Sequence, residues 1–227
     1  MTTHEPLRPL TASRQKALGV AVDRYASSVI DALDWLEERG VTAATAAMFR
    51  LGVVDDPAPG HEGYRGRLCI PYMDANNNVT QVRFRCLKDH KCSDSGCPKY
   101  LTVAGDDPRL FNVEALQTVG DTLHVAEGEF DAMILTQLGL PAVGVPGVST
   151  WQYRHTVAAK NFNAIYVWGD GDNAGREFNQ KLYALLDKAR LVGVPDGEDV
   201  SSLNLQGPTV VMDLLKRTQA PYLEGAA

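Results

Sequence analysis

Short apolar runs alternate with longer amphipathic segments in the second half of the chain, from Thr122 onward. The runs LHVAE, PAVGVPG, AIYVWGD and LVGVP predict strands, because each is short, apolar and bounded by polar or glycine-rich residues. The segments FDAMILTQLG, STWQYRHTVAAKNF and AGREFNQKLYALLDKA lie between them and predict helices. Such alternation is typical of a parallel sheet covered by helices.

The first half of the chain has two other patterns. Between Arg14 and Arg50 apolar residues recur at helical spacing, and Gly40 stands where a helix C-cap is expected. Thr42 predicts the start of a second short helix. Further on, RLCIPYMD and VTQVRFRCL predict two strands joined by the turn residues ANNN, which favours a hairpin.

These patterns predict an α/β fold, α+β overall, with four parts. A helical N-terminal segment at 1–60 begins with a loose tail and precedes a small strand-rich basic subdomain at 61–120. A domain with a mostly parallel sheet flanked by helices follows at 121–205, and a short helix and tail at 206–227 end the sequence. We expect the chemistry in the third part, because ligands of parallel sheets bind beyond the carboxyl ends of the strands.

Charge and composition narrow the classes of function. The 227 residues include 22 basic and 28 acidic side chains, a net charge of −6, so the whole chain carries no bulk signal for nucleic-acid binding. From His61 to Val103, however, seven Lys or Arg face four acids, a local balance of +3. No apolar run is long enough for a membrane span, and the first residues lack the apolar core of a signal peptide. We therefore expect no membrane partner, a cytoplasmic location and reduced cysteines.

Carboxylates follow two of the predicted strands directly. Glu127 comes after LHVA, and Asp170 and Asp172 come after AIYVWG. Asp131 lies four residues past Glu127, in the first turn of the predicted helix, and its side chain is directed back towards the same strand end. Like charges so placed repel one another, and a hard divalent cation such as Mg²⁺ relieves that repulsion. The sequence therefore predicts a divalent-metal site here, whereas Glu129 is interpreted as an ordinary helix-end charge.

The ordered motifs resemble those of the DnaG-type, phage-like primases. EGEFD at 127–131, GVPG at 144–147 and GDGDNAG at 169–175 are similar to the Toprim domain, which primases share with topoisomerases and certain nucleases. RGRLCIPYMDANNNVTQVRFRCL, PKYL and RLFN resemble the basic subdomain that precedes Toprim in those primases, and LDWLEERGVTAATAAMFRLGVV resembles their helical entry segment. VPDGEDVSSL resembles their last acidic loop.

The resemblance implies a DNA primase that makes short RNA primers on single-stranded DNA from NTPs by metal-dependent nucleotidyl transfer, as a DNA-directed RNA polymerase in DNA replication. It implies Mg²⁺ or Mn²⁺ bound by three carboxylates, namely Glu127, Asp170 and Asp172, with Asp131 and Asp199 completing the acidic catalytic site. It also implies nucleic-acid or nucleotide contacts by residues of the basic subdomain, namely Arg67, Arg85, Lys99, Tyr100 and Asn112. To these we add Arg83, which lies in the same predicted strand as Arg85.

The sequence departs from the family pattern at one site position. Ser201 stands where the family carries a second acid after the one that Asp199 matches, which puts a full second metal shell in doubt. No segment matches the family's zinc-binding module or helicase-binding domain, so a replicative helicase or a separately encoded zinc module is an expected partner, in a bacterium or a phage-infected host. Two other functions stay open: a Toprim-type metal-dependent nuclease, and a non-catalytic Toprim module that binds DNA.

A polar loop after the second predicted strand carries candidate zinc ligands. His90, Cys92 and Cys97 lie close together, with Cys86 six residues before Cys92. The spacing lacks a Cys-x₂-Cys pair, and Cys86 falls in a strand where it would serve as a core residue. The sequence favours an ordinary reduced loop over a zinc site and leaves the second interpretation open.

Overall fold

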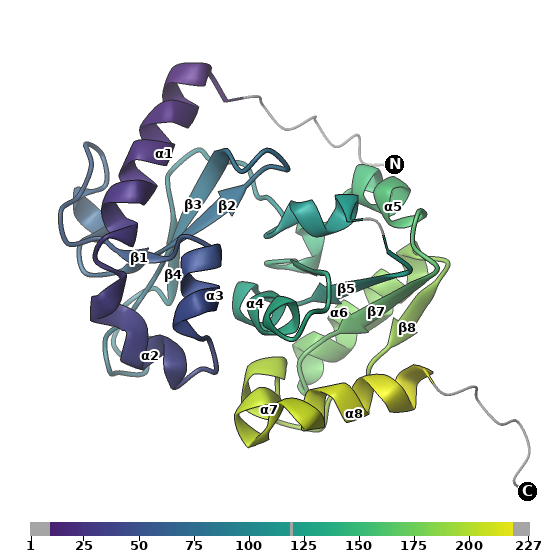
Figure 1. Cartoon of the computed structure of the whole chain (residues 1–227). Helices are drawn as coiled ribbons and strands as arrows, with labels where there is room; N and C mark the ends of the chain where they lie inside the picture. The colour runs from purple at the N-terminus through teal and green to yellow at the C-terminus, as the bar shows by residue number, and fades with distance from the viewer. Residues whose placement is uncertain (1–9, 119, 220–227) are drawn as a thin grey trace, which may run out of the picture. The chain divides into compact units, whose positions relative to one another are not determined.

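A computed structural model gives the fold of the chain, and it describes residues 10–118 and 120–219. By its internal contacts the chain divides into two compact units, Met1–Glu114 and Ala115–Ala227. Each unit builds its own sheet, antiparallel in the first and parallel in the second (Figure 1). The expected fold class, helices and a strand-rich part followed by a mostly parallel sheet with flanking helices, is confirmed.

The first unit combines short helices with a four-stranded antiparallel sheet of order β1-β2-β3-β4. Thr11 caps α1 by accepting a hydrogen bond from the Arg14 N–H, and Thr42 caps α3 in the same way. The elements are α1 (Ala12–Ala26), η1 (Val29–Ala32), α2 (Leu33–Glu37), α3 (Ala43–Met48), β1 (Gly52–Val53), η2 (Glu62–Tyr64), β2 (Leu68–Met73), β3 (Val79–Arg85), β4 (Tyr100–Thr102) and η3 (Val113–Gln117), the last of which spans the unit boundary.

Helix α1 covers one face of this sheet. Its buried residues Val22 and Tyr25 belong to the same core cluster as Val82 and Phe84 of β3. Because strand side chains alternate between faces, Arg83 and Arg85 project from the opposite face. The alternation that buries one half of β3 therefore presents its arginines together.

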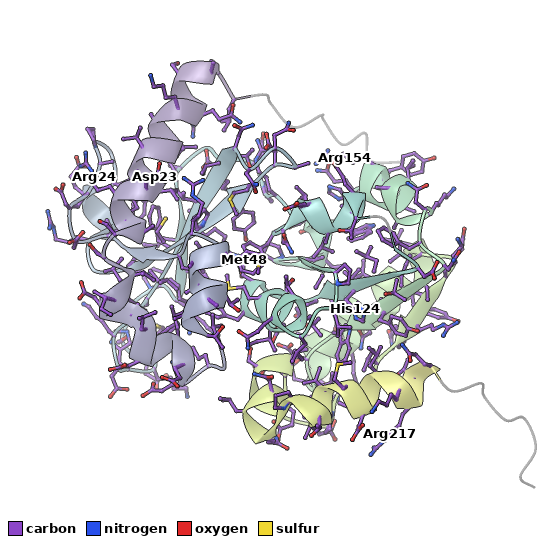
Figure 2. All side chains as sticks on the ribbon, viewed as in Figure 1. Asp23, Arg24, Met48, His124, Arg154 and Arg217 are labelled. Carbon is purple, nitrogen blue, oxygen red and sulfur yellow. The ribbon has the colours of Figure 1, made fainter. Side chains whose placement is uncertain are left out.

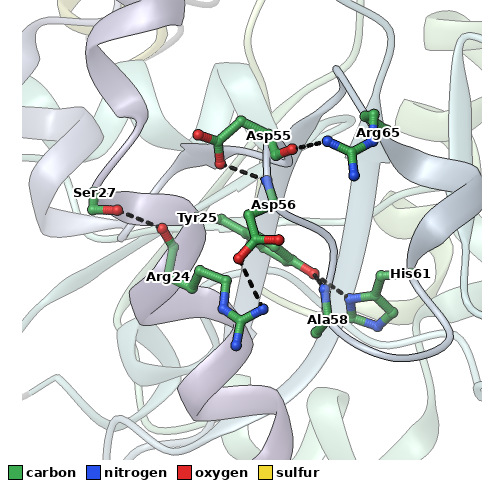
Figure 3. A network of polar contacts seen from close by, with 8 residues as sticks. All are labelled: Arg24, Tyr25, Ser27, Asp55, Asp56, Ala58, His61 and Arg65. Atoms are coloured by element: carbon green, nitrogen blue, oxygen red, sulfur yellow. Dashed lines mark hydrogen bonds and ion pairs between the residues drawn. The ribbon is translucent and has the colours of Figure 1, made fainter.

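A polar network fastens the end of α1 to the loop that follows β1 (Figure 3). The buried Tyr25 hydroxyl accepts from the Ala58 N–H at 2.8 Å and shares a hydrogen bond of 2.9 Å with Nδ1 of His61. Arg24 pairs with Asp56 at 3.2 Å in the same region. Burial raises the pKa of Tyr25 and lowers the pKa of His61, so both side chains are neutral around pH 7 and suit an interior hydrogen bond.

The second unit is built on a four-stranded, all-parallel sheet of order β6-β5-β7-β8. The chain moves outward from β5 to β6 in one direction and from β7 to β8 in the other. With right-handed crossovers, α4 and α6 then lie on opposite faces of the sheet. The elements are β5 (Thr122–Ala126), α4 (Glu129–Gln137), β6 (Ala142–Gly144), η4 (Val148–Thr150), α5 (Tyr153–Ala159), β7 (Ala164–Trp168), α6 (Asn173–Leu185), β8 (Ala189–Leu191), α7 (Val200–Gln206) and α8 (Pro208–Gln219).

His124 lies in the interior of this unit, on strand β5 (Figure 2). It is 1% exposed, its ring stacks on Tyr166, and its Nδ1 accepts a hydrogen bond of 3.0 Å from Nε1 of Trp168. Burial lowers the pKa of His124 to about 3. The side chain is therefore a neutral, hydrogen-bonded part of the core, as its place in an apolar strand predicts.

Several predicted boundaries were wrong. The last strand of the sheet is Ala189–Leu191 rather than LVGVP, because α6 ends at Leu185 and the chain pairs with β7 at once. The helix predicted from STWQYRHTVAAKNF begins only at Tyr153, after an extended Gln152. The two- and three-residue strands β1 and β4 and helix α7 were not predicted, since such short elements show no periodicity.

The predicted tails fall largely on residues 1–9 and 220–227, which lie outside the described residues. Within the described ranges, α1 begins at Ala12, two residues before the helical pattern predicted from Arg14. The helices of the described ranges are all too short or too polar to cross a bilayer.

Candidate active site and nucleic-acid interface

Glu127 and Asp170 follow the two central strands of the parallel sheet. Strands β5 and β7 are parallel neighbours, and Ala126 pairs with Trp168 in their register. Both strands therefore end at the same edge of the sheet. This edge is the switch point where the strand order reverses, which is where α/β sheets open to ligands. The Asp170 N–H donates to Oε2 of Glu127 at 3.3 Å, which joins the two strand ends directly.

The turn after β7 also pairs with the loop that precedes α7. The Gly171 N–H donates to the Glu198 carbonyl, and the Gly197 N–H donates to the Gly171 carbonyl, both at 2.8 Å. A Cβ on Gly171 would lie 1.8 Å from the Pro195 carbonyl oxygen, so only glycine permits this approach. The close pairing places the start of α7 beside the strand ends.

Four of the five candidate acids have one carboxylate oxygen held by a backbone N–H. Asp172 caps α6 by accepting from Gly175 at 2.8 Å, and Asp199 caps α7 by accepting from Ser202 at 2.6 Å. Oε2 of Glu127 accepts from Asp170, as described above. In Asp131, Oδ1 accepts both the N–H and the hydroxyl of Ser201, at 3.2 and 3.1 Å. Among the described residues, none donates a hydrogen bond to the second carboxylate oxygen of any of these four acids.

Burial and the charges of neighbouring carboxylates raise the pKa values of three of the acids, Glu127, Asp131 and Asp170. The pKa of Asp170 is raised to about 7, first by burial and then by Asp131, Glu127, Asp199 and Asp172 in that order. The pKa of Asp131 is raised to about 7 by burial and by the charge of Asp199, against the lowering effect of its serine hydrogen bonds. Burial also raises the pKa of Glu127. The structure thus brings the other four predicted acids into electrostatic range of Asp170.

A divalent cation fits this donor set. Among the described residues, Lys, Arg and His form no ion pair with any of the five acids, so the repulsion has no counter-charge from the chain. The carboxylate oxygens of the five acids do not converge into a closed site in which the protein supplies every metal ligand. The group of described residues whose donor atoms do converge in this way lies in the loop after β3. Mg²⁺ keeps several waters and takes only one or two carboxylates directly, so an open arrangement of oxygens suits it.

Glu129 differs from these acids. It lies in the first turn of α4, where a negative charge complements the helix dipole, and it is 2% exposed.

In the first unit, guanidinium groups and aromatic rings lie against one another in a group that we call the basic stack: Trp35, Arg39, Arg83, Arg85 and Tyr100. Tyr100 pairs with Arg85 across β3 and β4, and its ring lies 4.4 Å from Cζ of Arg83 and 5.0 Å from Cζ of Arg85. Arg85 also lies 5.6 Å from the ring of Trp35, whose ring carries Arg39 at 3.6 Å. Cation–π contacts hold these arginines in place.

Sequence reasoning missed two members of this stack. Trp35 lies among the apolar residues at helical spacing between Arg14 and Arg50, and neither Trp35 nor Arg39 was predicted to bind nucleic acid. The spacing of four residues between them on a helix was the available signal.

The other predicted nucleic-acid residues lie in different settings. Arg67 donates to the Pro98 carbonyl at 2.9 Å and approaches Sγ of Cys97 at 3.4 Å, so its guanidinium is engaged by the polar loop. Lys99 is exposed, and its carbonyl accepts from the Cys86 N–H. Asn112 is partly buried, with a left-handed φ of 56°. The structure therefore gathers Arg83, Arg85 and Tyr100 into one group and places the Arg67 guanidinium against the polar loop, and the nucleic-acid contacts of all these residues stay a prediction.

The loop after β3 brings its cysteines and histidine together. Donor atoms of Cys86, His90, Cys92 and Cys97 all lie within 4.8 Å of one another. Cys86 is buried, as a core residue would be, but its sulfur belongs to this group.

Comparison with known proteins agrees with this architecture. Residues 124–203 match a family model described as Toprim-like, and this range contains all five acids. The RNA polymerase domain of Mycobacterium tuberculosis primase DnaG superposes with a TM-score of 0.75 at 21% identity, covering 91% of this chain and 84% of that one. A DnaG primase catalytic domain bound to single-stranded DNA gives a TM-score of 0.69 at 22% identity over 89% of this chain and 78% of that one.

Two curated relatives are also similar. The Gene 57 protein of Mycobacterium phage D29 is 39% identical over 144 residues, which are 62% of this chain and 91% of that protein. A DNA primase of Clostridium acetobutylicum is 24% identical over 200 residues, 82% of this chain. The match spans 31% of the clostridial protein.

The fold and the acid cluster define the class: a Toprim-fold protein with the architecture of DnaG-type primase catalytic cores. Within that class, the chain belongs to the family of the phage D29 Gene 57 protein.

Proposed function

We propose that this chain is the polymerase core of a DNA primase, which joins NTPs into short RNA primers on single-stranded DNA. The observation that carries the proposal is the group of five acids at the switch point of the parallel sheet. Two of them have pKa values raised to about 7, and the described residues supply no cation to balance them. Sites with such perturbed carboxylates are candidates for metal-assisted chemistry.

Each acid has a proposed role. Glu127, Asp170 and Asp172 would hold Mg²⁺ or Mn²⁺, with Asp131 and Asp199 completing the negative field. When bound, such ions lower the pKa of an attacking 3′ hydroxyl and neutralise charge on the triphosphate. The backbone N–H groups that fix one oxygen of four of these side chains restrict their rotation. The free oxygens would thereby be oriented before the ion and substrate arrive.

The basic stack would bind the nucleic acid. Arg83 and Arg85 carry positive charge beside the aromatic ring of Tyr100, the combination that single-stranded nucleic acids use, with phosphates near cations and bases on rings. The likeness to a primase domain bound to single-stranded DNA supports this role. Such a function would act in the cytoplasm of a bacterium or of a phage-infected host.

The test is primer synthesis by the full chain with a single-stranded template, NTPs and Mg²⁺ or Mn²⁺. Short RNA products are expected, and Glu127→Gln or Asp170→Asn should lower their yield by at least about 100-fold with the fold retained. Asp196→Asn is the matched control, because Asp196 is an exposed neighbouring acid paired with Arg176. Unchanged synthesis in either site variant contradicts the metal-site assignment.

The same assay separates the other two functions. Degraded DNA instead of RNA indicates a Toprim nuclease that uses the same acids. DNA binding with neither product indicates a non-catalytic binding module.

A further inference from the structure

We propose that Cys86, His90, Cys92 and Cys97 bind one structural zinc ion in the first unit. Three sulfurs and one imidazole nitrogen form one of the common closed zinc donor sets. Zinc binding here is independent of the activity proposed for the acids, which belong to the other unit.

The distances between the donor atoms fit a tetrahedral ion. Zn–S bonds of about 2.3 Å at tetrahedral angles place two sulfurs about 3.8 Å apart, and a sulfur and a nitrogen slightly closer. Sγ of Cys86 lies 3.6 Å from Sγ of Cys97 and 3.6 Å from Nε2 of His90. All four donors lie within 4.8 Å of one another. A disulfide would join two of the cysteines but would not explain why the third cysteine and His90 also lie close to them, whereas a zinc ion explains all four positions.

Arg67 supplies the outer shell that such a site needs. Three thiolates and one Zn²⁺ leave one net negative charge on the site. The Arg67 guanidinium approaches Sγ of Cys97 at 3.4 Å and donates to the neighbouring Pro98 carbonyl at 2.9 Å. A cationic donor to a ligating sulfur balances that charge and orients the ligand.

The loop itself explains why an ion is needed. Cys86 directly follows β3 and Cys97 shortly precedes β4, so the ion would close the whole connection between these strands. Residues 88–91 and 93–96 within it are exposed and polar, so the loop has almost no apolar surface to bury. A metal supplies the folding free energy that such a segment cannot obtain from a core.

Closure of the loop also fixes the basic stack. The Cys86 N–H donates to the Lys99 carbonyl at 3.0 Å, and Tyr100 follows at once as the first residue of β4. The zinc ion would thereby hold Tyr100 against Arg83 and Arg85. Its role is structural, since all four positions around the ion are filled by the chain.

Metal analysis of the full chain tests this proposal, after growth in zinc-supplemented medium and removal of any affinity tag. One zinc per chain is expected, and Co²⁺ in its place should give thiolate charge-transfer bands together with the intense visible bands of a tetrahedral site. His90→Ala and Cys92→Ser should lose the metal, whereas His90→Cys should keep it. Cys69→Ala is the matched control, because Cys69 is a free, buried cysteine of the same unit outside the cluster.

A second measurement uses the unaltered protein and does not depend on how the variants fold. Zinc removal by a chelator should unfold the loop, so that trypsin cleaves it faster at Lys88 and Lys91 and three thiols become reactive, and added zinc should reverse both changes. The proposal is overturned if the purified chain holds no stoichiometric zinc, if Cys92→Ser keeps it, or if Cys86 and Cys97 form a disulfide in the native protein.

Discussion

Ser201 donates both its backbone N–H and its hydroxyl to Oδ1 of Asp131, a residue 70 positions earlier in the chain. The resemblance to DnaG-type primases predicts an acid at this position, as part of a second metal shell. In this protein the serine instead stabilises the ionised form of a buried carboxylate. Its contribution to the site is thus as a hydrogen-bond donor to a neighbouring acid.

Ser201→Ala should weaken Mg²⁺ binding near neutral pH. Loss of the hydroxyl donor removes about 1 kcal/mol of stabilisation from the ionised carboxylate and raises the pKa of Asp131 by about 0.7. With the pKa at about 7 beforehand, the ionised fraction at pH 7 falls by about 3-fold, and at pH 9 the difference vanishes. Isothermal titration with Mg²⁺ at both pH values measures the effect. Ser201→Thr keeps the hydroxyl and should bind normally; a loss that persists at pH 9 contradicts this explanation.

Asp170→Asn should stabilise the metal-free protein above neutral pH. Burial and four carboxylates raise the pKa of Asp170 from 3.8 to about 7. A raised pKa favours the folded state at low pH, and this advantage is lost as the pH rises from about 4 through about 7. Because the side chain is partly exposed, the variant should gain only about 1–2 kcal/mol in free energy of unfolding at pH 8, and less at pH 5.

Urea unfolding at the two pH values measures this gain. Added Mg²⁺ should stabilise the unaltered protein and not the variant, which reverses their order. A variant less stable than the unaltered protein at pH 8 without metal would show that Asp170 is paired rather than repelled.

Gly175→Ala should destabilise the second unit although alanine favours helices. A Cβ at this position of α6 would lie 2.0 Å from the carbonyl oxygen and 2.4 Å from the backbone nitrogen of Asp170. The turn that carries Asp170 therefore has to move. We expect a loss of about 2–4 kcal/mol in the free energy of unfolding, more than the ~1 kcal/mol gained in helix propensity. Gly193→Ala is the control, since its Cβ would meet nothing within 4 Å. Equal stability of the two variants in chemical denaturation would contradict the tight packing.

Arg85→Ala should weaken binding of single-stranded DNA and lower its salt dependence. If Arg85 neutralises one phosphate, the slope of log affinity against log salt falls by about 0.7. Arg217→Ala removes the same charge from the exposed surface of α8 and should leave the slope unchanged (Figure 2). Fluorescence anisotropy with a labelled oligonucleotide over a salt series measures both. The same slope for Arg85→Ala and the unaltered protein would assign Arg85 to the structure of the sheet alone.

The sequence by itself determined the fold class and the order of most of the longer elements. Apolar periodicity is a local property, so it located β5 and β7 and the acids that follow them. It failed for β1 and β4, whose few residues carry no period, and for the end of α6, which is set by pairing with the neighbouring strand.

Only the tertiary structure decided which side chains act on one another. The hydrogen bonds from Ser201 to Asp131 and the convergence of Cys86 with His90, Cys92 and Cys97 depend on turns that fold distant or irregularly spaced residues together. No periodicity encodes such contacts. The raised pKa values of Asp131 and Asp170 likewise arise from burial and from the sum of several charges, which exist only once the sheet has brought the strand ends side by side.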